Sequence, residues 1–316
     1  MLRNTPCRPK NTHPARKPQQ QLQRRRRRQT GPSAPPAGRG SSPPTSGSKA
    51  GPSGGVVPDL ARLAWPFDPT VYIGLAAFAV AYLWLARDRS RLQSAFFGLG
   101  VLVAWFALET PVDAIGDCCL QSVHMVQHIL LGLIAPPLWL LGLTPASAAR
   151  LTRLLPGLRT ITEPLPAQVI FAVLMLGWHL PVLYDATLAS EPLHIVEHLT
   201  FMAGGALFWW PVLIATSTTA RWRLREAGKL VYLVVGTLPQ DTVSLILIFS
   251  HQPYYEHYVR SARAIAGVDP LTDQTLAGIA LMAAGKISFL VAGVKIFFDW
   301  MIRVRAEEAG PRLVGG

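Results

Sequence analysis

Two histidine pairs with helical spacing are the residues of this chain best placed to do chemistry. His124 and His128 lie four residues apart in "HMVQHILLGLIAPP", and His194 and His198 repeat that spacing in "HIVEHLTF". Residues at positions i and i+4 share one face of a helix, so each pair would point two imidazoles in the same direction. Neutral imidazoles at this spacing are good ligands for copper, zinc or haem iron.

Other groups with metal-binding chemistry lie close to these pairs. Met125 and the adjacent Cys118 and Cys119 offer soft sulfur atoms, which favour Cu(I). Nearby acids could bind a metal directly or orient the imidazoles: Asp113, Asp117, Asp185, Glu191 and Glu197. The predicted metal ligands are His124, His128, His179, His194 and His198, with Met125 and Glu197 as additional or supporting groups.

Motifs of the common enzyme classes are absent from the sequence. It contains no glycine-rich phosphate loop, no G-x-S-x-G and no C-x-x-C. "HIVEH" differs from the H-E-x-x-H zinc-protease motif because its glutamate stands beside the second histidine. Three cysteines are also too few for a disulfide framework. We therefore expect a protein that is not an enzyme.

The elements that must position the histidines are long apolar segments. Half of the 316 residues are hydrophobic and only 15% are charged. The apolar residues lie in runs near the roughly 20 residues needed to cross a bilayer core of about 30 Å. In lipid such runs must be helical, because the backbone finds no other hydrogen-bond partners. The sequence predicts an all-α membrane protein, a bundle of seven transmembrane helices within residues 66–305. The predicted segments are 70–86, 95–108, 122–143, 167–184, 193–215, 229–250 and 276–298.

Positive charge in the short loops predicts the orientation of this bundle. Arginines and lysines gather in 87–94, 144–166 and 216–229, and Arg303, Arg305 and Arg312 lie at the C-terminus, whereas 109–121 and 185–192 contain none and 251–275 contains two arginines. The N-terminus should therefore lie outside and the C-terminus in the cytoplasm. The histidines of the third and fifth segments then fall in their outer turns, and His179, His251 and His257 fall at the same face.

This one-sided placement has a simpler alternative explanation. The histidines could lie at the membrane interface and form hydrogen bonds with the backbone, lipid headgroups or acidic side chains. Two i, i+4 pairs at one face favour a binding site, because ionisable groups in membrane segments are costly and usually functional. In mid-membrane, Asp241 and Lys286 should pair inside the bundle, because an unpaired charge there costs about 2.5–3.5 kcal/mol on insertion scales.

The first 65 residues differ from the rest of the chain. They contain the run Arg24 to Arg28 and supply much of the formal net charge of +12. Such a run can bind nucleic acid or anionic lipid. However, the composition is rich in Pro, Gly, Ser, Gln and Arg, which predicts a disordered tail and no nucleic-acid partner. A translation start near Val56 or Val57 would remove the tail and keep every other feature.

Three stretches together resemble a known family. They are "GWHLPVLYDATLASEPLHIVEHLTFMAGGALFWWPVL", "HMVQHILLGLIAPPLWLLGLTP" and "LTDQTLAGIALM". Their WHLP, HxxEH and FWWP elements are similar, in order and spacing, to the seven-helix cytochrome c oxidase assembly factors called CtaG, over about residues 66–305. The resemblance implies a multi-pass protein of the bacterial plasma membrane that is needed to mature haem–copper oxidase and is linked to copper delivery.

The family motifs carry over onto particular positions of this chain. The basic tail, the cysteine pair and Lys286 depart from the family pattern. Oxidase subunits, the lipid bilayer and a copper chaperone are the implied partners. The positions that match the family are His124, His128, Trp178, His179, Pro181, Tyr184, His194, Glu197, His198, Trp209, Trp210, Pro211, Asp273 and Gln274.

Four functions remain open on the sequence. The leading one is an assembly factor that binds copper through the outward-facing histidines. The first alternative is a haem b membrane redox protein. Histidines at one membrane face argue against it, because they provide no ligands for a second haem that could receive electrons across the bilayer. The others are a copper permease, which needs polar groups along a path through the membrane, and a structural scaffold for oxidase subunits without a metal.

Overall fold

The computed structural model describes residues 65, 67–214, 219–261 and 268–308, and these are mainly helical with no strand among them. The predicted tail, the C-terminal residues 309–316 and part of the loop 216–229 lie outside the described residues. The helices are α2 Pro69–Leu85, α3 Arg91–Glu109, α4 Pro111–Cys118, α5 Gln121–Ile129, η2 Leu130–Ile134, α6 Ala135–Leu141, α7 Pro145–Leu154, α8 Leu158–Ile161, α9 Pro164–Trp178, α10 Pro181–Ala189, α11 Glu191–Leu213, α12 Glu226–Phe249, α13 Glu256–Ser261 and α14 Pro270–Glu308.

Each of the seven predicted segments is largely helical, which confirms the all-α class. Four described helices are long and apolar enough to cross a membrane: α3, α5–η2–α6, α12 and α14. The bent pair α9 and α10 would make a fifth span, and α2 is apolar but shorter. The seven-span count and the orientation stay predictions.

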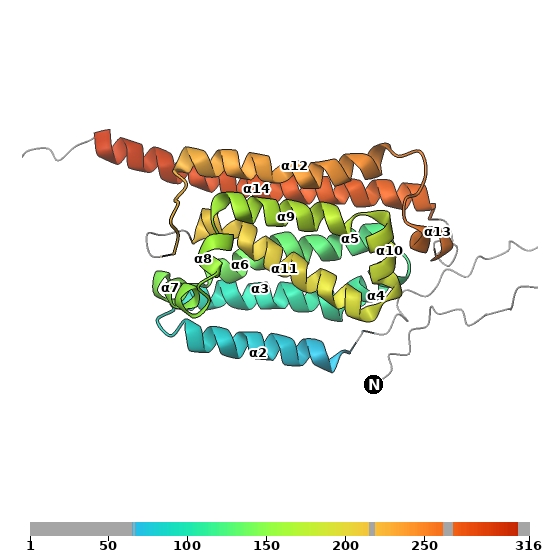
Figure 1. Ribbon diagram of the computed structural model, residues 1–316, viewed down its shortest axis with the longest axis horizontal. Helices are drawn as coiled ribbons and strands as arrows, with labels where there is room; N and C mark the ends of the chain where they lie inside the picture. The colour runs from blue at the N-terminus through green and yellow to red at the C-terminus, as the bar shows by residue number, and fades with distance from the viewer. Residues whose placement is uncertain (1–64, 66, 215–218, 262–267, 309–316) are drawn as a thin grey trace, which may run out of the picture. The chain divides into compact units, whose positions relative to one another are not determined.

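Short helices and loops gather at the two ends of the bundle. In Figure 1, α4, α10 and α13 lie at the end where α5 and α11 begin, and α7 and α8 lie at the opposite end. Capping residues start several of the helices. Ser90 and Thr144 form capping boxes at α3 and α7, and Asp68 accepts a hydrogen bond from the Thr70 N–H at α2.

The fourth predicted segment, 167–184, was wrong as a continuous helix. The chain ends α9 at Trp178, turns through 72° and begins α10 at Pro181. Proline has no N–H to donate and disfavours helical geometry in the residue before it. Leu180 accordingly has an extended backbone, with φ −65° and ψ 130°. Pro181 therefore causes the break, which leaves His179 at the end of α9.

The third predicted segment is continuous but irregular. A π-helical turn, η2, joins α5 to α6, and Pro136 and Pro137 occupy the first turn of α6. Gly205 of α11 lies against the backbone carbonyl of Gly132 in η2, where a Cβ would collide with it. This close approach seats α11, and the histidines at its start, directly against the α5–η2–α6 segment.

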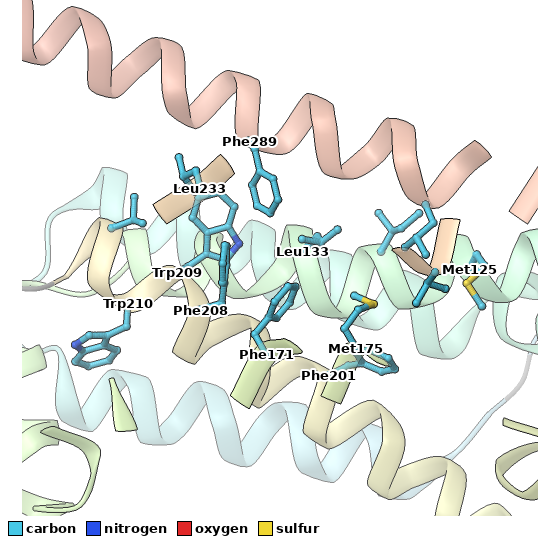
Figure 2. Close-up of a cluster of buried hydrophobic side chains, with 14 of the residues drawn as sticks. Met125, Leu133, Phe171, Met175, Phe201, Phe208, Trp209, Trp210, Leu233 and Phe289 are labelled. Carbon is cyan, nitrogen blue, oxygen red and sulfur yellow. The ribbon is translucent and has the colours of Figure 1, made fainter. Parts of the chain in front are cut away.

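A hydrophobic core lies between α5, α9, α11, α12 and α14. Figure 2 shows Phe208 and Trp209 of α11 beside Phe289 of α14, with Phe171 and Met175 of α9 further along the cluster. Phe208 also stacks on Tyr232 of α12, with ring centroids 5.1 Å apart. This core fixes the positions of the helices that carry the histidines.

The predicted pairing of Asp241 with Lys286 is confirmed, but its predicted place inside the bundle is wrong. The Lys286 ammonium binds the Asp241 carboxylate between α12 and α14. The Lys286 side chain is 51% exposed, so the pair lies on the outer surface of these two helices. Two adjacent helices can satisfy a mid-span charge pair at their shared edge as well as in the interior.

Candidate metal centre

Four of the five predicted histidine ligands come from the starts of α5 and α11. His124 and His128 lie on one face of α5, and His194 and His198 lie on one face of α11. Their rings lie close together. The centroids of His194 and His198 are 4.1 Å apart, and those of His124 and His194 are 5.3 Å apart. The two i, i+4 pairs therefore face each other across the contact between their helices.

Three of these histidines form one buried group. The ligand nitrogens of His124, His128 and His198 lie within 4.8 Å of one another. The Nε2 atoms of His124 and His128 are 2.7 Å apart, so one imidazole donates a hydrogen bond to the other. Because imidazole nitrogens bind metals at about 2.0–2.1 Å, this group matches the size and donor chemistry of a small metal ion.

Glu197 adds a carboxylate to the buried group. Its Oε1 lies 3.7 Å from Nε2 of His128, and the side chain is completely buried. Neither carboxylate oxygen has a hydrogen-bond partner in the described part of the chain. The nearby Thr187 hydroxyl donates to the Tyr184 carbonyl instead. Burying a carboxylate without a partner is costly, so this position requires a cation or a proton.

A second group overlaps the first. Asp117, His124 and His194 also have ligand atoms within 4.8 Å of one another. The Asp117 carboxylate lies 3.7 Å from Nδ1 of His124 and 3.5 Å from Nδ1 of His194. Asp117 was one of several acids that the sequence offered, and only the fold distinguishes it from Asp185 and Glu191. The turn between α4 and α5 brings its carboxylate back over the first turns of α5 and α11.

His179 lies next to these groups without belonging to either. Its Nδ1 donates to the Met175 carbonyl at 2.6 Å, which leaves Nε2 as the nitrogen with the lone pair. That Nε2 is buried without a hydrogen-bond partner among the described residues, and the ring centroid is 6.0 Å from that of His128. His179 is thus available at the edge of the buried group.

The sulfur atoms of Met125, Cys118 and Cys119 are not part of the two histidine groups. Met125 is completely buried in the hydrophobic core cluster, as Figure 2 shows. Cys118 and Cys119 form a disulfide with each other at the end of α4. A disulfide is not a thiolate ligand, so the histidines and the carboxylates are the donors that the fold brings together.

Neighbouring residues hold the site in place. His257 of α13 donates from Nε2 to the Asp117 carbonyl at 2.8 Å. Burial is the main cause that lowers the pKa of His257, which favours the neutral ring. Tyr258 donates to the Gly116 carbonyl at 2.8 Å. The seventh histidine, His251, is exposed in the loop after α12.

Tyr184 and Asp273 are two positions whose structural roles the sequence did not reveal. The Tyr184 ring is completely buried beside His124, with centroids 5.4 Å apart, and it stacks on Tyr255. Asp273 of α14 accepts hydrogen bonds from the first residues of α5. Both roles join residues far apart in the sequence, and neither leaves a local spacing signal.

The comparison with protein families decides the membership of the chain. A family model described as cytochrome c oxidase caa3 assembly factor matches residues 76–303. The chain belongs to this assembly factor family. The match includes the buried histidine group, Asp117 and Asp273, and it confirms the family that the sequence motifs indicated. No curated protein and no solved structure matched the chain.

Membership of the caa3 assembly factor family supports a membrane protein that acts in the assembly of cytochrome c oxidase, and hence an association with that oxidase. The apolar helices agree with this membrane character. Family membership alone assigns no metal to the histidines, whose role has to be argued from their chemistry.

Proposed function

We propose that this chain is a non-enzymatic assembly factor that binds copper at the histidine groups of α5 and α11 and delivers it to haem–copper cytochrome c oxidase. It works in the bacterial plasma membrane as a multi-pass protein, with the site near the outer face. The proposal combines the family membership with the predicted orientation, in which the loops rich in arginine and lysine stay in the cytoplasm.

One observation carries the copper assignment. Glu197 is a buried carboxylate without a hydrogen-bond partner among the described residues, and it lies beside three imidazoles. A cation bound by His124, His128 and His198 would compensate its charge. Imidazole donors suit copper, and among first-row divalent ions copper binds such ligands most strongly. Haem–copper oxidases, which this family helps to assemble, require copper.

The alternatives fit the geometry less well. The nitrogens of the buried group lie within 4.8 Å of one another, which suits a small ion better than a haem, whose macrocycle needs space between its ligands. A permease needs polar groups along a path through the bundle. The Lys286 side chain of the Asp241–Lys286 pair is 51% exposed, so this pair lies at the surface of α12 and α14 and does not extend the histidine groups into a polar path through the bundle.

Metal analysis of the purified protein tests the proposal. The wild-type protein, loaded anaerobically with Cu(I) and freed of excess metal, should retain copper at a fixed ratio to protein. The double variant His124→Ala, His198→Ala should lose it. The matched control is His251→Ala, which removes an exposed histidine outside the groups and should leave the copper content unchanged. Equal copper in all three proteins, or a Soret band from bound haem, would contradict the proposal.

A further inference from the structure

His124 belongs to both groups of potential ligands, through different nitrogens. Its Nδ1 lies 3.7 Å from the Asp117 carboxylate, on the side where His194 also lies. Its Nε2 lies 2.7 Å from Nε2 of His128, on the side of the buried group. The two ring nitrogens of an imidazole point in nearly opposite directions. His124 therefore stands between two positions that could each hold a metal ion.

The two positions differ in their access to the surface. The Asp117 side chain is 32% exposed and that of His194 is 10% exposed. In the buried group, the side chains of His128 and Glu197 are 2% and 0% exposed. An ion that arrives from the surface therefore meets Asp117 and His194 before it reaches His128 and Glu197, and His124 is the ligand that the two positions share.

The donor sets also differ in a way that suits successive binding. The outer position offers a carboxylate oxygen and two imidazoles, a partly solvated set from which an ion can leave readily. The buried position offers three imidazoles beside the Glu197 carboxylate, away from water. Electrostatic attraction to a carboxylate is stronger where water is excluded. The buried position should therefore hold the ion longer.

We propose that His124 passes the copper ion from an outer position, formed with Asp117 and His194, to the buried position formed with His128 and His198. This inference rests on the proposed copper binding and adds a route to it. A neutral imidazole has one nitrogen with a free lone pair, so His124 binds the ion through Nδ1 or through Nε2, and one ion at a time.

The transfer of the ion changes the tautomer of His124, with no net change in the number of protons or in the oxidation state of copper. While the ion is bound at Nδ1, the ring proton resides on Nε2. As the ion moves to Nε2, that proton passes to water, and Nδ1 takes up one proton from the water that reaches Asp117, so the step neither gains nor loses a proton overall. The Nδ1–H then points at the Asp117 carboxylate, which can accept it and fix the tautomer. The copper keeps its oxidation state, so the step needs no oxidant or reductant.

Loading and release of Cu(I) in the full-length purified protein test this route. The wild-type protein should bind one Cu(I), and a water-soluble Cu(I) chelator should remove it slowly. Asp117→Asn should still bind one Cu(I) with the same slow release but load about tenfold or more slowly, because a group that positions the ion has been lost. The matched control Glu256→Gln neutralises an exposed acid of α13 and should load at the wild-type rate.

A second variant separates the two positions. His128→Ala combined with His198→Ala should retain one Cu(I) in the outer position and release it to the chelator much faster than the wild-type protein. A melting temperature near that of the wild type verifies that each variant is folded, and His194→Ala replaces Asp117→Asn if the latter unfolds.

Two results would overturn the route while leaving copper binding intact. One is a wild-type loading rate in Asp117→Asn, or in His194→Ala where that variant replaces it. The other is complete loss of Cu(I) from the His128, His198 double variant. A wild-type protein that binds no Cu(I) would refute the proposed function as well, so the two failures are distinguishable.

Discussion

Asp273 of α14 holds the first turn of α5, the helix that carries His124 and His128. Its carboxylate accepts hydrogen bonds from the Gln121 N–H at 2.6 Å and from the Ser122 hydroxyl at 2.5 Å. The first N–H groups of a helix have no partner within the helix, and a carboxylate there also interacts favourably with the helix dipole. Asp273 thereby fixes the position of α5 from a helix 152 residues away in the chain.

Replacing this aspartate should disturb both stability and copper binding. Asp273→Ala leaves the Gln121 N–H and the Ser122 hydroxyl without their acceptor, which should destabilise the protein by about 1–3 kcal/mol. It should also weaken Cu(I) binding, because α5 is no longer held against α14. Thermal melting and a Cu(I) competition titration measure the two effects.

Asp269→Ala provides the matched control for Asp273. Asp269 accepts hydrogen bonds from the Thr272 N–H and hydroxyl at the exposed start of α14, and within the described part of the chain its carboxylate makes no hydrogen bond to α5. The Asp269→Ala variant should have a lower melting temperature and an unchanged Cu(I) affinity. Equal Cu(I) affinity in both variants would show that Asp273 acts only on stability.

The contact between Gly205 and Gly132 should tolerate no added methyl group. In Gly205→Ala, the new Cβ would collide with the Gly132 carbonyl, and overpacking of this kind typically costs about 1–3 kcal/mol. The control Gly177→Ala meets nothing within 4 Å and should gain slightly from the better helix propensity of alanine. Melting temperatures in detergent would measure the difference, and equal values would contradict the close packing.

The pair Asp241 and Lys286 predicts compensating effects on abundance. Lys286→Met should lower the amount of protein in the membrane, because it leaves the Asp241 carboxylate without its partner. Adding Asp241→Asn should restore much of the loss, since the remaining residue is neutral. Quantitative immunoblots of membranes give the comparison. A double variant no more abundant than Lys286→Met would count against the pair.

Thiol labelling in intact cells tests the predicted orientation. In a background with Cys7, Cys118 and Cys119 replaced by serine, a cysteine at Ala189 should react with an impermeant reagent, whereas one at Thr160 should react only after cell lysis. Both positions are exposed, so accessibility within the fold does not separate them. They lie near opposite ends of the bundle, at α10 and α8. The reverse pattern would place the histidines at the cytoplasmic face.

Spacing within one helix is the part of the site that the sequence could predict. His124 and His128, like His194 and His198, share a helix face because helical geometry dictates it, and four of the five predicted histidines take part in the two ligand groups. The i, i+4 spacing could not show that the two faces would meet. That depends on the packing of α11 against the α5–η2–α6 segment at Gly132 and Gly205.

Interactions between distant segments explain what the sequence left undetermined. Asp117 enters the site because α4 turns back over α5, and no spacing distinguishes it from four other acids near the histidines. The break between α9 and α10 was missed because membrane helices tolerate proline near their ends and kinks, although Pro181 was the local signal for it. Met125 had suitable chemistry for copper, yet its place on the helix buries it in the core.

The copper content of the oxidase itself tests the central claim most directly. Cytochrome c oxidase would be purified from cells that carry the wild-type factor or His198→Ala, and its copper would be measured relative to its haem. The account predicts that His198→Ala, present in the membrane at wild-type abundance, leaves the oxidase with its haem and short of copper, while His251→Ala leaves the ratio unchanged. An oxidase with its full complement of copper in the His198→Ala cells would contradict the account.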